Sequence, residues 1–417
     1  MNVLIVGGGI GGLSLALMLK QRGIDCEIYE SARELQPLGV GINLLPHATI
    51  EIEALGLLPR VAEQAIETSS LHYYNRFGQP IWKEPRGLAA GYPVPQYSIH
   101  RGTLQMILAQ AVLDRMGSAC LHTGMAFESL EQDENGVTAH FVDRNTGVSQ
   151  SRRADLLIGA DGIHSAVRRH FHKDIDQLRY SGRMLWRAVT EGEPYLDGRS
   201  MFMAGHQDQK FVCYPISEPL RKQGRSLINW IAELRVPHAE LPKTDWNREV
   251  PASTFAEHFD QWRWDWIDIP EVIRGAKAIY EFPLVDKDPL PRWTFGRATL
   301  LGDAAHPMYP IGSNGAAQAI RDARYLADRL QEARPGHRES MEHALLEYEA
   351  ERLPVTAGIV LRNRLNGPEQ VMQIAHERAP QGFTHIHNVI PQEELEAISI
   401  RYKRIAGFDP NMLRKAS

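Results

Sequence analysis

The sequence is poor in cysteine and has no long apolar run. Its three cysteines, Cys26, Cys120 and Cys213, are far apart and form no CxxC pair, so we expect no disulfide framework. No hydrophobic segment approaches the length of a membrane span. The formal net charge is only −5, and a mildly acidic chain is a poor match for nucleic acid or an anionic membrane. These absences predict a cytoplasmic protein without a nucleic-acid or membrane partner.

A recognisable set of metal ligands is also missing. His170 with His172, and His385 with His387, form two close pairs, and Asp174 lies near the first. Neither pair is completed to the three or four ligands that a metal site requires. We therefore predict solvated histidines and no metal.

The N-terminus lacks the positively charged segment of a secretory signal, and five glycines interrupt residues 3–19. Residues 3–6 form a short apolar run typical of a buried parallel strand. The spacing G-x-G-x-x-G follows at Gly7, Gly9 and Gly12, and the apolar residues after it suit a helix packed on a sheet. A second apolar strand then ends at Glu30.

Each part of this pattern has a physical role in a dinucleotide site. One glycine permits a tight turn, the next lets a pyrophosphate approach the backbone, and the third lets the helix pack closely on the strand. The helix N-terminus stabilises phosphate charge. Glu30 is placed to accept hydrogen bonds from a ribose diol. The pattern predicts dinucleotide binding, but alone it does not separate NAD from FAD.

Later segments indicate that the nucleotide-binding fold is split. At 417 residues the chain is too long for one ordinary core, so we expect two closely packed domains. A helix opens at Arg101, and a strand, a turn and a second strand follow at residues 126–142. A buried strand ends before Asp161, and another ends at Gly302 ahead of a helix. The segment between, residues 184–284, is rich in β-forming runs.

Three motifs in this order resemble the single-component FAD-dependent aromatic hydroxylases: the GxGxxG, the Asp161-Gly162 pair and the Gly302-Asp303 pair. Within that family, the segments PLGVGIN, PVPQYSIHRG, LWRAVTE, DWNR and DKDPLPRW look most like phenazine-carboxylate monooxygenases, and salicylate hydroxylases are a more distant match. The resemblance implies an α/β fold with a Rossmann-like FAD-binding domain, an inserted β-sheet substrate domain and a helical C-terminal region. The boundaries that we expect are 1–180 and 285–365 for the split FAD-binding domain, 181–284 for the sheet, and 366–417 for the C-terminal extension.

The resemblance also implies where non-covalently bound FAD would lie. Gly9, Ile10 and Gly11 would follow the pyrophosphate, with Glu30 on the adenosine ribose. Arg101 would reach the pyrophosphate or the ribityl chain. The other implied contacts are Met125 beside the adenine, Asp303 on a ribityl hydroxyl, and Asp161 in the loop where the nicotinamide nucleotide docks transiently. The whole expected set is Gly7, Gly9, Ile10, Gly11, Gly12, Glu30, Gly41, Arg101, Met125, Asp161, Asp303, Gly312, Gly315 and Ala316.

The sequence contains no second GxGxxG, which fits transient docking of NADPH or NADH and argues against a reductase with two dinucleotide sites. The segment Gly312 to Gly315 opens a helix. Its N-terminus, aimed at the pyrimidine side of the flavin, would favour the negative charge of the reduced ring. Asn314 stands where the family usually has glutamine, and Ala317 where it usually has asparagine. Since backbone contacts should survive, we expect the flavin geometry to change little.

Three residues are candidates for the substrate side. Arg187 is either a surface arginine or a pocket residue that pairs with a substrate carboxylate. Tyr214 either hydrogen-bonds a phenolic oxygen or packs. Pro310 matches a family proline whose carbonyl faces the substrate ring, whereas His306 is expected to be structural.

Two other segments carry no predicted chemistry. Trp262, Trp264 and Trp266 alternate in WRWDWIDIP and are expected to pack in a core or at a domain interface. A long helix is expected around Pro354, which would kink or break it. Residues 367–417 either cover the active-site entrance or mediate self-association, and their last residues, NMLRKAS, are expected to fray.

The resemblance implies a monooxygenase. NADPH or NADH would reduce FAD, O2 would add at flavin C4a, and the hydroperoxide would transfer OH to a small aromatic or heteroaromatic substrate, with or without loss of CO2. Two alternatives remain: a flavin reductase or dehydrogenase that never hydroxylates, and a non-catalytic redox sensor. The three motifs with an inserted sheet weigh against the first, and the lack of a visible effector module weighs against the second. The protein would be a monomer or a homodimer.

Overall fold

The glycine-rich start of the chain builds a five-stranded parallel sheet with the order β21-β12-β1-β2-β8. The computed structural model describes residues 1–37, 39–237, 248–407 and 409. β1 is central and almost wholly buried, which explains its continuous apolar run. The predicted Rossmann-like fold is confirmed. The strands are β1 (Asn2–Val6), β2 (Asp25–Glu30), β8 (Leu121–Thr123), β12 (Leu156–Gly159) and β21 (Ala298–Leu300).

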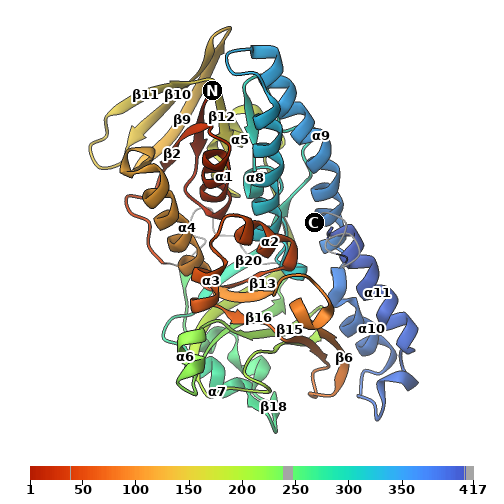
Figure 1. The fold of residues 1–417 in the computed structure, drawn as a ribbon. Coiled ribbons are helices and arrows are strands. Elements are labelled where there is room, and N and C mark those ends of the chain that lie inside the picture. The colour runs from red at the N-terminus through yellow and green to blue at the C-terminus, as the bar shows by residue number, and fades with distance from the viewer. Residues whose placement is uncertain (38, 238–247, 408, 410–417) are drawn as a thin grey trace.

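Long helices surround this sheet and form the upper part of the molecule in Figure 1. They are α1 (Ile10–Gln21), α4 (Arg101–Met116), α8 (Gly315–Glu332) and α9 (Arg338–Asn363), with the shorter α2 (Pro46–Ala54), α3 (Leu58–Gln64) and α5 (Ala166–Phe171). α9 contains Pro354 and continues through it, so the break considered from the sequence does not occur. Pro354 lies on the exposed side of α9, where water can serve the carbonyl that loses its partner.

Two small antiparallel sheets accompany the parallel one. The strand, turn and strand expected at residues 126–142 are confirmed as β9 (Met125–Asp133) and β10 (Gly136–Asp143), joined by β11 (Ser149–Ala154). A second small sheet contains β3 (Gly41–Leu44), which pairs with β7 (Tyr97–His100). β4 (Ile66–Glu67) pairs with the same strand.

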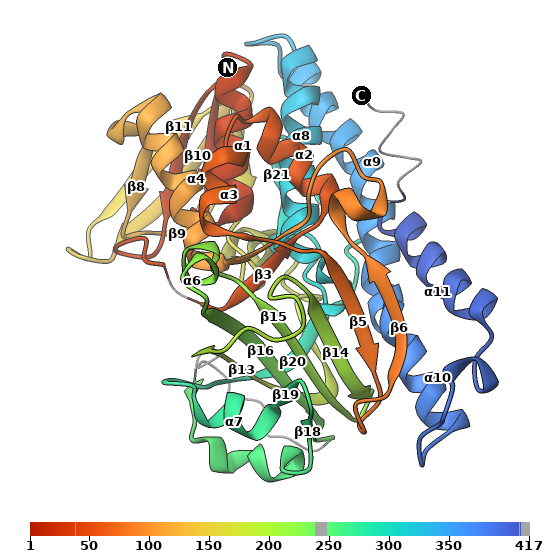
Figure 2. The same ribbon diagram turned by 60° about the horizontal axis from the view of Figure 1, so that its bottom comes forward.

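An eight-stranded sheet forms the lower layer, with the order β17-β20-β13-β16-β15-β14-β5-β6. Six of its strands come from the inserted segment and its immediate borders: β13 (Leu178–Gly192), β14 (Met201–His206), β15 (Gln209–Pro215), β16 (Ser226–Arg235), β17 (Arg248–Glu249) and β20 (Tyr280–Lys287). β5 (Ser70–Tyr74) and β6 (Pro80–Pro85) come instead from residues 1–180, which the sequence assigned to the FAD-binding part. These two strands belong to the eight-stranded sheet because β5 pairs in parallel with β14, as Figure 2 shows.

The two faces of this sheet have different partners because side chains alternate along each strand. One face carries Trp186 and Trp230 and packs against Trp262 and α7 (Ile269–Arg274) in an aromatic core. The predicted packing role of the alternating tryptophans is confirmed, since Trp264 and Trp266 pack against each other with tilted rings at the edge of that core. The other face turns toward the parallel-sheet layer.

The C-terminal region packs along the edge of the eight-stranded sheet. It comprises η7 (Gly367–Glu369), α10 (Gln370–Arg378) and α11 (Gln392–Ile405), and Figure 2 shows both helices beside β6. Val371, Met372 and Leu395 are buried against residues of β5 and β6. The predicted fraying of NMLRKAS falls outside the described residues. None of the described helices has the length and hydrophobicity needed to cross a membrane.

Candidate active site

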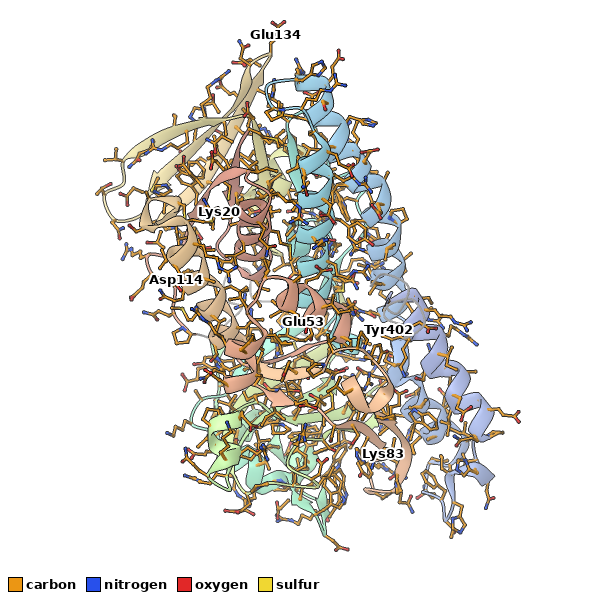
Figure 3. All side chains as sticks on the ribbon, viewed as in Figure 1. Lys20, Glu53, Lys83, Asp114, Glu134 and Tyr402 are labelled. Carbon is orange, nitrogen blue, oxygen red and sulfur yellow. The ribbon has the colours of Figure 1, made fainter. Side chains whose placement is uncertain are left out.

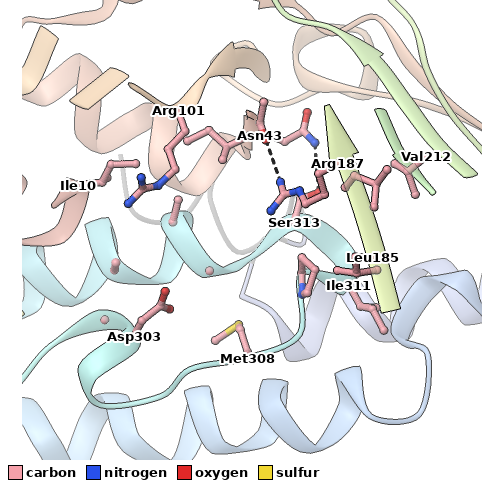
Figure 4. Close-up of a pocket in the computed structure, with 18 of the residues that line it drawn as sticks. Ile10, Asn43, Arg101, Leu185, Arg187, Val212, Asp303, Met308, Ile311 and Ser313 are labelled. Carbon is pink, nitrogen blue, oxygen red and sulfur yellow. Dashed lines mark hydrogen bonds between the residues drawn. The ribbon is translucent and has the colours of Figure 1, made fainter. Parts of the chain in front are cut away.

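A cavity of about 320 Å³ lies between the two layers. Figure 4 shows Arg101 and Asp303 on one side of it, and Arg187, Leu185 and Val212 on the other. The structure brings together most of the residues singled out from the sequence. Those that line the cavity are Gly9, Ile10, Gly11, Gly41, Arg101, Arg187, Tyr214, Asp303, Pro310, Gly315 and Ala316.

The N-terminus of α1 opens onto this cavity. Its first main-chain bond runs from Leu13 N to Gly9 O (3.0 Å), so the amide groups before Leu13 have no acceptor within the helix. Gly7 and Gly12 do not line the cavity but make this turn possible. A Cβ on Gly12 would lie 2.1 Å from the carbonyl oxygen of Gly7, and Gly7 itself has a φ of +113°. Only glycine fits either position.

The carboxylate of Glu30 is fixed at the end of β2. Its oxygens accept hydrogen bonds from the amides of Gly8 and Ala32, each at 2.7 Å. This places an oriented carboxylate beside the glycine turn, where a ribose diol would complete its contacts. Met125 lies apart from the cavity, buried in the core at the start of β9.

Asp161 holds the loop between β12 and α5. Its carboxylate accepts hydrogen bonds from Ser165 Oγ (2.5 Å), Ala166 N (2.7 Å) and Val167 N (3.2 Å). Burial raises the pKa of Asp161, although these hydrogen bonds oppose that shift. The neighbouring Gly162 lines the cavity. Asp161 therefore stabilises the cavity-side loop without facing the cavity itself.

Asp303, unlike Asp161, faces the cavity. Within the described part of the chain no hydrogen bond to its carboxylate is formed, and its oxygen lies 3.9 Å from the position that a Cβ on Gly315 would take. Burial raises its pKa, whereas His306 and Arg101 oppose that shift. An acceptor without a protein donor is suited to a ligand hydroxyl.

A buried network supports the turn that carries Asp303. Asp322 accepts hydrogen bonds from Gly302 N (3.1 Å) and Arg352 Nε (2.7 Å), and its carboxylate lies 2.5 Å from His306 Nε2. Burial alone would raise the pKa of Asp322, but His306 and Arg352 outweigh it and hold the pKa at about 2. His306 thus has the structural role that was expected of it.

The loop from Pro310 to Gly315 is shaped by two left-handed residues, Gly312 (φ +70°) and Ser313 (φ +57°). A left-handed serine is strained, and Asn43 supports it by donating a hydrogen bond to Ser313 Oγ (3.2 Å). Gly312 approaches α11 so closely that a Cβ would lie 2.0 Å from Tyr402 Oη. The loop then enters α8, whose N-terminal residues Gly315 and Ala316 face the cavity.

Arg187 is a cation within the cavity that lacks a carboxylate partner in the described residues. Its Nη2 makes one long hydrogen bond to Gly41 O (3.4 Å), and its buried Nε has no hydrogen-bond partner. Burial lowers its pKa, and Arg101 adds to that effect. Trp186 points to the opposite face of β13, so Arg187 is the one of the two that faces the cavity.

Tyr214 is held beside Arg187 by the backbone. Its hydroxyl donates to Gly41 O (2.8 Å), and burial raises its pKa to about 12, with Arg187 opposing the shift. Asn229 Oδ1, on β16, accepts a hydrogen bond from the backbone N of Gly41 on β3 (2.6 Å). Tyr214 and Asn229 therefore anchor β3 to the sheet, and the phenol remains a neutral donor.

The sequence did not reveal the rest of the cavity wall. Leu185, Met203, Val212 and Ile231 make the sheet side of the cavity apolar, and Lys210, Glu233 and Glu369 close one end. Lys210 and Glu233 face each other across β15 and β16. Only the two-residue alternation of those strands could have indicated that they share a face with Tyr214 and Ile231.

The described residues contain no group of three or more His, Cys, Asp or Glu arranged to hold a metal ion. Cys26, Cys120 and Cys213 are separate, buried thiols. The residues present do fit FAD. The open amides of α1, the oriented Glu30 and the unpartnered carboxylate of Asp303 match a pyrophosphate, a ribose and a ribityl chain.

A family model described as FAD binding domain matches residues 1–363. The chain is 44% identical over 367 residues to the phenazine 1,6-dicarboxylic acid hydroxylase PhzS of Lysobacter antibioticus, covering 87% of this chain and 89% of that protein. It is 32% identical over 404 residues to the 3-amino-4-hydroxybenzoate 2-monooxygenase of Streptomyces cremeus, covering 92% and 93%. Among solved structures, Klebsiella pneumoniae HpxO complexed with FAD and uric acid has a TM-score of 0.74 and 25% identity, covering 99% of this chain and 97% of that one.

These similarities span nearly the whole chain and agree with the geometry of the cavity, so the two alternatives, a reductase and a sensor, are not favoured. The enzyme uses FAD with NAD(P)H and O2. The chain belongs to the FAD-dependent aromatic hydroxylases and is a flavoprotein monooxygenase.

Proposed function

We propose that this monooxygenase hydroxylates a fused heteroaromatic carboxylate of the phenazine-carboxylate class. The observation that carries the proposal is Arg187, a cation in the cavity whose Nε is buried and has no hydrogen-bond partner. Buried charges are costly unless they are paired, and a guanidinium matches a carboxylate in shape and hydrogen bonding. The apolar wall of Leu185, Val212 and Ile231 suits the flat face of an aromatic ring. The similarity to a phenazine dicarboxylic acid hydroxylase supports a phenazine-type ring as the frame of the substrate.

The cofactor residues have separate tasks. Bound FAD supplies electron transfer from NAD(P)H and the activation of O2. The amides of Ile10 and Gly11 would hold its pyrophosphate, Glu30 its ribose, and Asp303 a ribityl hydroxyl. Arg101 would balance phosphate charge at the same end of the cavity. The N-terminus of α8 at Gly315 would stabilise negative charge on the flavin ring.

The substrate residues orient the ring rather than react with it. Arg187 would pair with the carboxylate, and the apolar wall would exclude water from the ring. Pro310 lines the cavity at the start of the loop that precedes α8 and would contact the ring through its carbonyl. Hydroxylation then leaves the carboxylate in place, or replaces it if the attacked carbon carries it.

Three further features belong to this proposal. The nicotinamide nucleotide would dock transiently beside the loop that Asp161 holds. The split between residues 1–180 with 285–365 and residues 181–284 would separate cofactor binding from substrate binding. The protein would act in the cytoplasm as a monomer or homodimer, a setting supported by its mild acidity and its three unpaired thiols.

The decisive experiment is anaerobic reduction of the flavin by NADPH and by NADH, with and without phenazine-1-carboxylate, salicylate or a neutral phenazine. We expect phenazine-1-carboxylate to accelerate reduction and to be converted, with O2, to a hydroxylated product identified by mass. The mass also shows whether CO2 is lost. Fast reduction that no acid changes, with hydrogen peroxide as the only product, would instead support a reductase. A flavin that neither nucleotide reduces would support a sensor.

A further inference from the structure

One end of the cavity is built from buried ions that are paired with one another. Lys210 Nζ lies 2.5 Å from Glu369 Oε2 and 2.9 Å from Glu233 Oε2. The relative exposures of Lys210, Glu233 and Glu369 are 4%, 3% and 6%. Arg183 Nε lies 3.7 Å from Glu233 Oε1. Two cations therefore face two carboxylates, and this end wall carries no net formal charge.

The pairing of strands fixes where the end wall lies relative to Arg187. Lys210 is opposite Glu233 across β15 and β16, and Arg187 is opposite Ile231, two residues along β16. Since a strand rises about 3.4 Å per residue, the two rows are about 7 Å apart. An aromatic ring that lies on Ile231 with one edge at Arg187 therefore presents another edge to the end wall.

Closing a cavity with buried ions costs free energy, because the ions lose their contacts with water. Burying ions costs several kcal/mol each, by order of magnitude, and an apolar wall would often be at least as stable. Glu233 Oε1 is buried and accepts no hydrogen bond from the described residues, so its contact there is the longer ion pair with Arg183. Burial raises the pKa of Glu369 despite Lys210. Because an ionised carboxylate can only accept hydrogen bonds, this end of the cavity offers no donor to a second carboxylate.

We propose, on the basis of the proposed function, that Lys210, Glu233 and Glu369 form a specificity-determining end wall that admits an uncharged ring edge and rejects a second carboxylate. Among the cavity-lining residues described on the sheet, Arg187 is the cation without a carboxylate partner, so it takes the single carboxylate of the substrate. A second carboxylate at the other end would meet Glu233 and Glu369 while Lys210 is already committed to them. Like charges placed together at a buried contact are strongly disfavoured.

The test measures binding of matched acids to the oxidised holoenzyme through the change in its flavin spectrum. The probes are phenazine-1-carboxylate against phenazine-1,6-dicarboxylate, and 1-naphthoate against naphthalene-1,5-dicarboxylate. The variants are Glu369→Gln and Glu233→Gln, which remove one negative charge at nearly constant volume. Glu257→Gln is the matched control, because Glu257 is exposed on the far side of the sheet layer. Flavin content and the unfolding temperature show whether each variant is folded.

The wild-type enzyme is expected to bind each monocarboxylate at least about tenfold more tightly than its dicarboxylate. Glu369→Gln should reduce that ratio by about tenfold, chiefly by tightening the dicarboxylate, and Glu257→Gln should leave it unchanged. If either variant is poorly folded, the other still decides. Equal binding of both acids by the wild type, or ratios that neither variant alters, would overturn the end-wall role while leaving the proposed function intact. Failure of every acid to bind would overturn both.

Discussion

At the scale of single residues, the informative groups in the cavity are two charged side chains that have no ion-pair partner in the described part of the chain. Arg187 and Asp303 are titratable groups that face the cavity, and neither has an oppositely charged partner at ion-pair distance in the described part of the chain. Asp303 lies on the side of the parallel sheet and Arg187 on the side of the large sheet, as Figure 4 shows. A ligand that satisfies both must span the two layers. A cofactor at Asp303 and a substrate at Arg187 meet this requirement together.

Replacing Arg187 tests the substrate half of this arrangement. Arg187→Ala removes a charge-assisted contact worth about 1.5–3 kcal/mol, so the apparent substrate constant for an aromatic acid should rise by about tenfold or more. A neutral analogue of the same ring should be affected by less than about threefold. The measurement is steady-state kinetics with the acid and its neutral analogue in both enzymes. Equal effects on the two compounds would remove the carboxylate pairing.

The same residues show what sequence can and cannot locate. Gly9, Ile10 and Asp303 belong to short motifs, because a pyrophosphate contact needs consecutive glycines and a turn after a strand. The spacing of the glycine motif located Gly9 and Ile10, whereas only the resemblance to the flavin hydroxylases assigned Asp303 to the same site. The structure places all three at one cavity, although their contacts with FAD remain predictions. Lys210 and Glu369 are 159 positions apart, and no local spacing reports such a contact. Only the strand pairing and the path of the C-terminal region bring them together.

At the scale of elements, α11 is a brace for the loop that precedes α8. Tyr402 Oη accepts a hydrogen bond from Asn314 Nδ2 (2.7 Å) and lies 3.2 Å from the oxygens of Ile311 and Asn363. Figure 3 shows Tyr402 where the C-terminal helices meet the rest of the molecule. The same loop contains the strained Ser313 and the close-packed Gly312. Its shape therefore depends on a contact from the C-terminal region.

Tyr402→Phe keeps the packed ring and removes the hydroxyl. We expect a loss of about 1–2 kcal/mol in the free energy of unfolding, because buried polar groups lose a partner, and weaker retention of FAD. Thermal unfolding and the FAD dissociation constant of the apoprotein measure the two effects. Tyr325→Phe is a control, since that phenol lies on α8 away from the loop. Unchanged FAD affinity in Tyr402→Phe would restrict the brace to stability alone.

A second contact between elements depends on pH. His206 at the end of β14 stacks on His376 of α10 with ring centroids 3.9 Å apart. Burial and His376 lower the pKa of His206 to about 4 from its ordinary value of 6.5. A histidine with a lowered folded-state pKa stabilises the fold above pH 6.5, and that stability is lost as the pH falls toward 4.

The expected loss over this range is about 1–3 kcal/mol. His206→Phe retains the stacked ring but cannot be protonated, so its stability should depend less on pH between 6.5 and 4. Denaturant unfolding at a series of pH values measures this, with His387→Gln as a control on an exposed histidine. A variant with the same pH dependence as the wild type would assign the effect to other groups.

The fold at element scale was largely predictable, and the exception has a clear cause. β1, α1 and β12 follow from apolar runs and glycine breaks that are local in sequence. From their residues alone, β5 and β6 could form an isolated hairpin, since nothing in their sequence indicates that β5 pairs with β14. The alternation of apolar and polar residues shows which face of a strand is buried. It does not show which distant strand becomes its neighbour, because tertiary packing decides that.

At the scale of the whole molecule, the two layers share one cavity but have separate cores. The core under the large sheet contains Trp186, Trp230 and Trp262. Among the described residues, the core of the nucleotide-binding layer contains one tryptophan, Trp293. Most of the long helices are in the nucleotide-binding layer, as Figure 1 shows. Tryptophan fluorescence and far-ultraviolet circular dichroism therefore report mainly on different layers.

Removing FAD should separate these two signals. With FAD at about 100 times its dissociation constant, binding adds about 2.7 kcal/mol to the stability of the native state, and both transitions should coincide. In the apoprotein we expect the dichroism transition to fall to lower temperature than the fluorescence transition, because the cofactor contacts are concentrated in the helical layer. If both transitions shift equally, the two layers unfold as a single unit with or without the cofactor.

The path of the chain through the cavity wall has a consequence during synthesis. The wall uses Gly9 from the beginning of the chain and Glu369 from η7, and Tyr402 braces its loop from α11. A ribosome that has completed the parallel sheet and the eight-stranded sheet has therefore still not released the residues that close the cavity. Nascent chains should not retain the flavin, and a chain stalled before Tyr402 should be colourless although most of its residues are already folded. Yellow colour in such a protein would thus report that translation has passed α11.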